Sequence, residues 1–138
     1  MLRIRTISRI MAPLTLAAMM LLCLATAASA TDKPRISFAP GSDSASLQGE
    51  IQGMDRDVYP ITAKAGQTMQ VTVANAHKLV LFRIQKPGTA ESYLPKAGED
   101  DDATQWQGVL PASGTYKIIV GAMRGDDTHY TLTVRITK

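Results

Sequence analysis

The sequence has little cysteine, and the one it has lies in a segment that we expect the mature protein to lose. Cys23 stands inside an apolar N-terminal run, and no other cysteine occurs in the 138 residues. A bacterial lipid-attachment motif requires a small residue before the cysteine, whereas Leu22 occupies that position. We therefore interpret Cys23 as an ordinary leader residue. A mature chain without cysteine forms no disulfide and must rely on its hydrophobic core, which is feasible at about 100 residues.

Acidic residues are absent from the first 31 positions, where Arg3, Arg5 and Arg9 precede an apolar run over residues 11–27. Ala28-Ser29-Ala30 then has the small-residue pattern of a signal-peptidase site. The apolar run is too short for a comfortable membrane span. The sequence thus predicts a cleaved signal peptide over residues 1–30, export to the periplasm, and one mature domain over residues 31–138 with no membrane attachment.

A net charge is also missing from the mature domain. The 15 basic and 12 acidic residues of the whole chain become 12 and 12 once the three arginines of the leader are removed. A neutral domain gives no basis for binding nucleic acid or an anionic membrane.

Catalytic motifs are missing as well. The chain has no Gly-x-Ser-x-Gly sequence, no glycine-rich phosphate loop and no paired histidines. His77 and His129 stand apart, without Glu or Cys at metal-ligand spacing. The acidic run at residues 99–102 lacks the alternating spacing of a calcium loop, and we interpret it as a solvated run. The sequence therefore predicts no enzyme, no metal site and no cofactor.

The mature chain does contain repeated alternation of apolar and polar residues. Residues 130–137 alternate Tyr, Leu, Val and Ile with Thr and Arg, which is the period of a strand with one solvated face. Residues 69–73 follow the same pattern, and the almost continuously apolar residues 79–84 indicate a central strand covered on both faces. Further strands are predicted at residues 35–38, 46–51, 58–64, 105–109 and 116–122. About eight short strands without a helical period predict an all-β fold, a single antiparallel β-sandwich.

Two features interrupt this pattern. Pro60 lies inside a predicted strand, which favours an edge position or a bulge. Residues 87–104 form a loop that is long for a hairpin, and loops of this length are commonly functional or mobile. Trp106 follows it in an alternating stretch, where a core position is favoured over an exposed platform for sugar rings.

The stretch Leu110-Pro111-Ala112-Ser113-Gly114-Thr115-Tyr116 joins two of the predicted strands. Its Pro, Ser and Gly are turn formers, so we expect an exposed loop that presents a hydroxyl, a flexible glycine and a phenol. A second interpretation stays open. Tyr116 shares one face of the following strand with Ile118 and Val120, so its ring could instead be buried at the end of an ordinary hairpin.

Four segments carry a resemblance to a known group: residues 49–53 (Gly-Glu-Ile-Gln-Gly), 57–59 (Asp-Val-Tyr), 64–67 (Lys-Ala-Gly-Gln) and 110–116. Their order resembles that of bacterial pre-peptidase C-terminal-like β-sandwich domains. More specifically, the chain is similar to the periplasmic inhibitors of g-type (goose-type) lysozyme. That family carries a short Ser-Gly-(x)-x-Tyr motif, matched here by Ser113, Gly114 and Tyr116, and uses basic side chains from neighbouring loops. The resemblance thus implies a lysozyme as partner and Arg124 as one such basic residue.

Physical chemistry suits these residues to blocking a lysozyme. Such an enzyme holds a carboxylic acid in a cleft shaped for a glycan. A serine hydroxyl such as that of Ser113 is a compact partner for the carboxyl group, and Gly114 lets the backbone enter the cleft. Tyr116 would add rigid contact area, and Arg124 could bind a carboxylate through two hydrogen bonds. We expect Ser113, Tyr116 and Arg124 to converge on the cleft.

The rival prediction is a binding module for polysaccharide or a surface protein. In that case we expect an aromatic contact surface with Trp106 or Tyr93 exposed, whereas an inhibitor requires accessible Ser113 and Tyr116 hydroxyls. Exposed edge strands are compatible with a monomer or a weak homodimer.

Overall fold

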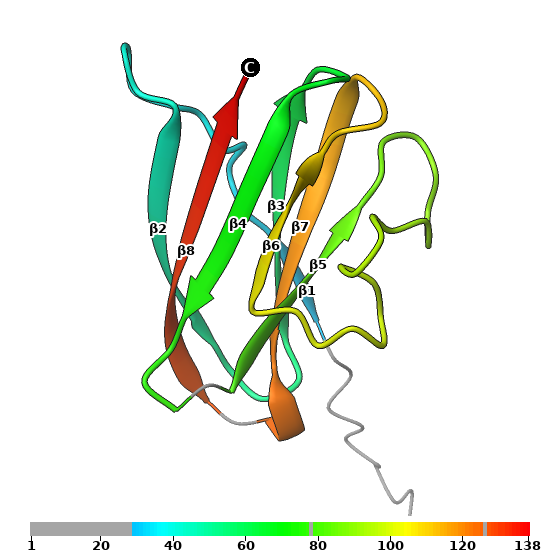
Figure 1. The fold of residues 1–138 in the computed structure, drawn as a ribbon. Helices are drawn as coiled ribbons and strands as arrows, with labels where there is room; N and C mark the ends of the chain where they lie inside the picture. Colours follow the sequence, from blue (N-terminus) through cyan, green and yellow to red (C-terminus); the bar gives the residue numbers. More distant parts are fainter. Residues whose placement is uncertain (1–28, 78, 126) are drawn as a thin grey trace, which may run out of the picture.

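The structure, a computed structural model, describes residues 29–77, 79–125 and 127–138, with Arg124 described by its backbone alone. Two four-stranded sheets face each other: sheet A in the order β1-β3-β7-β5 and sheet B in the order β2-β8-β4-β6 (Figure 1). The strands are β1 (Ala30–Asp32), β2 (Ser44–Ile51), β3 (Arg56–Ala63), β4 (Thr68–Ala74), β5 (Val80–Gln85), β6 (Gln105–Val109), β7 (Gly114–Ala122) and β8 (Thr128–Thr137). The predicted all-β sandwich is confirmed.

The described part of the chain contains one helical element, the short 3-10 helix η1 (Met123–Gly125) between β7 and β8. No helix among these residues is long and apolar enough to cross a membrane. Most of the predicted leader, residues 1–28 with Cys23, lies outside the described residues.

The core between the sheets follows from the alternation in the sequence. β8 buries every second residue, and β7 buries Tyr116, Ile118 and Val120 completely. Burying a side chain of this size contributes about 1.5–3 kcal/mol to folding. The largest fully buried side chains include Tyr116, Phe82, Ile51, Ile61, Met69 and Ile84.

The N-terminal edge of sheet A differs from the prediction. The expected strand at residues 35–38 is wrong: the first strand is β1, which pairs parallel with β3 while the other strand pairs are antiparallel. After β1, the chain follows β3 through two hydrogen bonds, Lys33 N to the Val58 oxygen (2.9 Å) and Ile36 N to the Pro60 oxygen (2.8 Å). Pro60 has no N–H and so cannot donate a hydrogen bond back to this segment, and the regular pairing of strands ends here. This explains how a proline is tolerated inside β3.

The prediction that residues 79–84 form a central strand is also wrong, because β5 is the edge strand of sheet A. Its apolar run is explained by the loop at residues 87–104, which covers that edge. Phe82 N donates to the Ala103 oxygen and Ile84 N to the Ala97 oxygen, each at 2.9 Å, while Leu94 N returns a bond to the Ile84 oxygen. Leu94, Ala97 and Ala103 are buried against the core. The loop therefore protects an edge that would otherwise expose unpaired backbone groups.

Candidate partner-binding site

The predicted loop lies at the upper end of the sandwich in Figure 1, where it packs against the turn between β3 and β4. Leu110 N donates to the Gln67 oxygen at 2.8 Å, and Gly66 N donates to the Leu110 oxygen at 2.9 Å. Leu110 itself is 1% exposed and anchors the loop in the core. The two turns thus form one unit, which we call the upper loop pair (residues 64–67 and 110–115).

Ser113 is exposed at the outer rim of this upper loop pair. Its Oγ accepts a hydrogen bond from the Ala65 N–H at 2.9 Å, which fixes the position of the side chain. Among the described residues no acceptor for the Ser113 hydroxyl hydrogen is present, so the hydroxyl is able to donate to a group outside the chain. Ser113 is thus exposed, as the inhibitor hypothesis requires, while its contact with a partner stays a prediction.

Gly114 is required by the backbone rather than by a ligand. Its φ of +148° lies in a region that side-chain-bearing residues rarely adopt. A Cβ built on Gly114 would also lie only 2.8 Å from the Cβ of Pro87. The glycine therefore lets β7 begin in close contact with the start of the loop at residues 87–104.

Tyr116 does not offer its hydroxyl to a partner, because the residue is 0% exposed. The phenol donates to the Ala112 carbonyl oxygen at 2.6 Å and accepts from the Ala112 N–H at 3.3 Å. The expectation of an accessible Tyr116 hydroxyl is thus wrong, and the alternative of a ring on the buried face of the strand is right. The Tyr116 hydroxyl thus bonds to the backbone of the turn that precedes its own strand. The same arrangement is found in the tyrosine corner of other β-sandwiches.

Arg124 lies in η1, at the other end of β7 from Ser113 and Gly114 (Figure 1). β7 has nine residues, so the two ends are about 30 Å apart. The prediction that Ser113, Tyr116 and Arg124 converge is therefore wrong: the structure brings the first two together and places Arg124 at the opposite end. The sequence pattern did not indicate that Ala65 and the turn around it are neighbours of Ser113.

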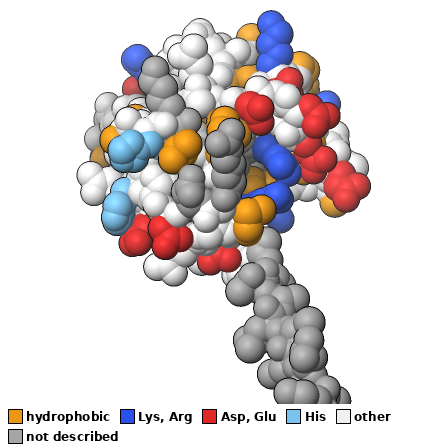
Figure 2. Space-filling model, turned by 90° about the horizontal axis from the view of Figure 1, so that it is seen from below, with side chains coloured by type: hydrophobic (Ala, Val, Ile, Leu, Met, Phe, Trp, Pro, Cys, Tyr) orange, Lys and Arg blue, Asp and Glu red, His pale blue; other side chains and the backbone are white. Residues whose placement is uncertain are grey.

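The lower end, viewed directly in Figure 2, presents charges of both signs. Basic side chains lie near the middle of this view, with acidic side chains on either side and the two histidines together near one edge. No group of three or more potential metal ligands occurs among the described residues. Among the side chains that the structure describes, this end therefore presents no surface of a single charge.

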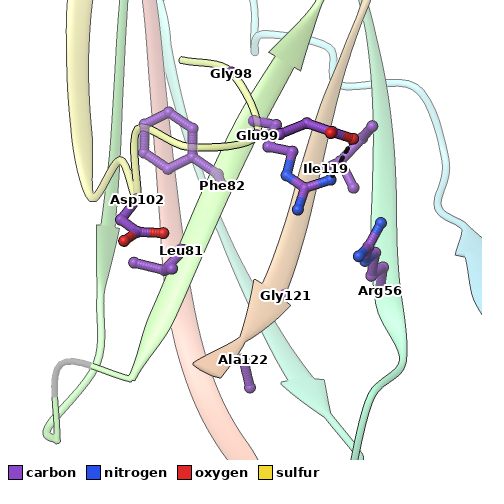
Figure 3. Close-up of a pocket in the computed structure, with 10 residues that line it drawn as sticks. Arg56, Leu81, Phe82, Gly98, Glu99, Asp102, Ile119, Gly121 and Ala122 are labelled. Atoms are coloured by element: carbon purple, nitrogen blue, oxygen red, sulfur yellow. Dashed lines mark hydrogen bonds and ion pairs between the residues drawn. The ribbon is translucent and has the colours of Figure 1, made fainter. Parts of the chain in front are cut away.

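A hollow of about 90 Å³ opens on the outer face of sheet A near this end. Arg56 and Leu81 line it on either side of Gly121 (Figure 3), and the Arg83 guanidinium in its wall is paired with Glu99 at 3.2 Å. The hollow is large enough for a few water molecules, and its charged groups are partly neutralised by each other.

The two aromatic residues named for a binding module are only half exposed. Trp106 packs against the edge of the core, and its indole N–H donates to the Pro95 oxygen at 2.8 Å. Tyr93 lies in the loop at residues 87–104, with its hydroxyl 3.5 Å from Glu99. Trp106 thus links β6 to that loop. It is neither fully buried, as the sequence pattern favoured, nor an exposed platform for sugar rings.

A buried polar cluster joins the two sheets within the core. Tyr130 of β8 donates to the Asp57 carboxylate of β3 at 2.5 Å, and the Tyr59 hydroxyl lies 2.7 Å from that of Tyr130. Lys33 approaches the other Asp57 oxygen at 3.7 Å. Burial raises the pKa of the Tyr130 hydroxyl far above its ordinary value, and the hydrogen bond to Asp57 raises it further. Since these groups satisfy one another, we interpret the cluster as structural.

Comparisons with known proteins agree with this architecture. The inhibitor of g-type lysozyme of Escherichia coli (strain K12) is 33% identical over 121 residues, which cover 79% of this chain and 82% of that protein. The crystal structure of Aeromonas hydrophila PliG, a periplasmic lysozyme inhibitor of g-type lysozyme, aligns with a TM-score of 0.65 and 38% identity over 80% of this chain and 100% of that one. No protein-family model matches the chain.

A more distant structure shows the same fold. The pre-peptidase C-terminal domain of a Bacillus anthracis collagenase has a TM-score of 0.54 at 15% identity, covering 78% of this chain and 96% of that domain. The fold therefore defines the class first: the chain is a two-sheet β-sandwich, the fold that it shares with the collagenase domain. The identity to the E. coli protein defines the family within it, and the chain belongs to the inhibitors of g-type lysozyme.

Proposed function

We propose that this protein is a periplasmic inhibitor of g-type lysozyme and has no enzymatic activity. The observation that carries the proposal is the 33% identity to the E. coli inhibitor over 121 residues. Export depends on the leader, which we propose is cleaved after Ala30. Residues 31–138 then form the mature inhibitor.

The upper loop pair is the part that we propose enters the active-site cleft. Ser113 and Gly114 form its rim, and the Ser113 hydroxyl donates to the carboxylic acid or carboxylate that the enzyme uses in catalysis. Tyr116 acts from beneath as a positioning residue, since its hydrogen bonds hold Ala112 in place. A loop already fixed by these bonds loses little conformational entropy on docking. Arg124, at the other end of β7, would contribute through a separate contact.

The test is a muramidase assay with protein that begins at Thr31. It is titrated against goose-type, chicken-type and invertebrate-type lysozymes, together with Ser113→Ala and the control Ser46→Ala. Ser46 is a hydroxyl on the outer face of sheet B, where it bonds to Thr133 at 3.1 Å. We expect stoichiometric inhibition of the goose type that weakens in Ser113→Ala and is unchanged in Ser46→Ala. Failure to inhibit any of the three enzymes at micromolar protein would overturn the proposal.

The second candidate function is a polysaccharide-binding module, favoured by the chemistry of sheet B. The outer face of this sheet has an open hollow whose wall is made mainly of amide and hydroxyl side chains, the groups that bind sugar hydroxyls. They are Ser44, Gln70, Thr72, Gln105, Gln107 and Thr133, and Trp106 and Arg135 complete the lining. Retention on insoluble peptidoglycan or other polysaccharide, lost in Gln70→Ala and Gln107→Ala, would support this function, and free passage would exclude it.

A further inference from the structure

The free edge of sheet B borders a groove beside the upper loop pair. β6 is an edge strand of this sheet, and the loop at residues 87–104 lies next to it in Figure 1. Between them is a hollow of about 470 Å³, which we call the β6 groove. Most of its lining is apolar: Leu94, Pro95, Trp106, Gly108, Val109 and Pro111. A concave, mainly apolar surface of this size is typical of a binding site.

Trp106 forms the floor of the β6 groove. Its half-buried indole reaches across from β6, and its N–H donates to the Pro95 oxygen on the opposite wall at 2.8 Å. The ring lies over Gly108, since a Cβ built on that glycine would be 2.8 Å from it. Val109, at the end of the strand, is 66% exposed. The groove thus contains an aromatic ring and a valine that the fold does not fully cover.

The backbone of β6 has unpaired groups along its outer edge. In an antiparallel pair every second residue bonds to the neighbouring strand. Val73 N donates to the Thr104 oxygen at 2.9 Å just before β6, and Leu110 N donates to the Gln67 oxygen at 2.8 Å just after it. The residues at odd positions between them therefore direct their N–H and C=O groups away from β4: Gln105, Gln107 and Val109. No other described strand pairs with this edge, so these groups are free to bond to an added strand.

We infer that the β6 groove binds an extended segment of the lysozyme, which adds to β6 as a further strand of sheet B. This inference rests on the proposed function. A stable complex buries about 800 Å² on each partner, far more than the rim residues Ser113 and Gly114 supply. Val109 precedes Ser113 by four residues, at most about 14 Å of extended chain. An enzyme seated on Ser113 therefore also reaches the end of the groove.

The groove suits an extended segment because its polar groups belong to the backbone. Strand addition takes its affinity from main-chain hydrogen bonds, while pockets beneath alternate side chains give specificity. β6 has five residues, so it spans about 17 Å. Every second side chain of the added strand faces Trp106. Of the residues that line the groove, Lys86 and Lys96 are charged, both positively, so we expect apolar or acidic side chains in the bound segment.

The first test places a proline at the free edge. Gln107→Pro removes an outward N–H without removing a bond to β4, and edge strands tolerate proline at such positions. The matched control is Gln48→Pro on β2, the opposite edge of the same sheet. Ile136 N donates to the Asp43 oxygen at 2.9 Å, so Gln48, five residues later, also directs its N–H away from the sheet.

A second variant tests the groove without altering the backbone. Val109→Glu places a charge beside Trp106, which disfavours an apolar or acidic segment there. Its control is Met54→Glu, at a position that is 58% exposed in the turn before β3, at the other end of the sandwich. Circular dichroism and urea unfolding establish that each variant is folded. The readouts are the inhibition constant against goose-type lysozyme and hydrogen exchange of the wild-type inhibitor with and without the enzyme.

We expect the inhibition constant to rise at least about tenfold in Gln107→Pro and Val109→Glu, and to stay within about twofold in the two controls. In the complex, the amides of Gln107 and Val109 should exchange more slowly, because they gain hydrogen bonds, whereas that of Gln48 should be unchanged. If Gln107→Pro does not fold, Val109→Glu and the exchange experiment on the wild type decide.

The two proposals fail in different ways. If the wild type inhibits and Ser113→Ala weakens inhibition, but the groove variants match their controls and the β6 amides exchange at an unchanged rate, the inference is overturned while the proposed function stands. Slow exchange at these amides in the inhibitor alone, increasing with its concentration, would assign the groove to a second copy of the chain and also overturn the inference. If the wild-type protein inhibits no lysozyme, both are overturned.

Discussion

The Tyr116 hydroxyl donates a 2.6 Å hydrogen bond to the carbonyl oxygen of Ala112, four residues earlier in the chain. The same hydroxyl accepts from the N–H of Ala112, so one buried phenol satisfies both backbone groups of that residue. Ser113 follows directly and is held by Ala65 on its other side. The rim of the loop is therefore fixed by contacts that do not involve the partner.

Tyr116→Phe removes these two hydrogen bonds without removing the ring. We expect the free energy of unfolding to fall by about 1–2 kcal/mol, because both backbone groups of Ala112 lose their partner. Lysozyme inhibition should weaken although the phenol is buried, because the loop is less well fixed before binding. Urea unfolding and the muramidase assay measure the two effects. The control is Tyr93→Phe, whose hydroxyl lies in an exposed contact with Glu99; a Tyr116→Phe protein that matches it in both assays would contradict the positioning role.

Gly114→Ala tests the backbone at the start of β7. Alanine at a φ of +148° is strained, and its Cβ would lie 2.8 Å from Pro87, so we expect a loss of more than about 1 kcal/mol in the free energy of unfolding. Gly121→Ala is the matched control in the same strand, because its Cβ would meet the nearest atom, Arg56 Cγ, at an ordinary 3.6 Å. We expect that variant to stay within about 0.5 kcal/mol of the wild type. If Gly114→Ala and Gly121→Ala have the same free energy of unfolding in urea, residues 86–88 must move to make room for the new methyl group.

Strands with one solvated face were predictable from the sequence, whereas edges were not. β8 alternates over its whole length, and its predicted range differs from the structure by two residues at one end. The continuous apolar run of β5 suggested a central strand, because a sequence pattern records how much a strand is covered but not what covers it. The cover is the loop at residues 87–104, which buries Leu94 and Ala97 beside β5.

The candidate site shows the same limit. The buried position of Tyr116 was predictable, since Ile118 and Val120 share its face. The separation of Ser113 from Arg124 was predictable too, because a complete strand lies between them. The contact between Ser113 and Ala65 was not predictable, since it joins segments 48 residues apart and depends on the register of β3 with β7.

Trp106→Phe should loosen the loop at residues 87–104 from β6. The substitution removes the 2.8 Å hydrogen bond from the indole N–H to the Pro95 oxygen, which joins the two segments. We expect faster hydrogen exchange at the amides of Leu94 and Ala97, which bond within or beside that loop. Val109→Ala, in the same strand at a position 66% exposed, is the control and should leave exchange unchanged. Unchanged exchange in Trp106→Phe would mean that the backbone bonds to β5 hold the loop without help from β6.

Tyr130 should make stability depend on pH in the alkaline range. Burial raises the pKa of its hydroxyl well above the ordinary value of 10.0, and the hydrogen bond to Asp57 raises it further. Below pH 10 the residue is protonated in both the folded and the unfolded protein, so its contribution to stability is fully present. Above pH 10 the unfolded chain releases this proton and the folded one retains it, which lowers the free energy of unfolding by about 1.4 kcal/mol per pH unit.

The measurement is urea unfolding of the wild type and Tyr130→Phe at several pH values from 8 to 11. At pH 8 the variant should be less stable by about 1.5–3 kcal/mol, because Asp57 loses a hydrogen bond to a charged group. That difference should shrink above pH 10, since phenylalanine has no proton to release and effects of lysine and the other tyrosines are common to both proteins. The contrary result is a difference in free energy of unfolding between the two proteins that stays constant from pH 8 to 11. In that case the Tyr130 hydroxyl would ionise in the folded protein as easily as in the unfolded chain, and the raised pKa would be contradicted.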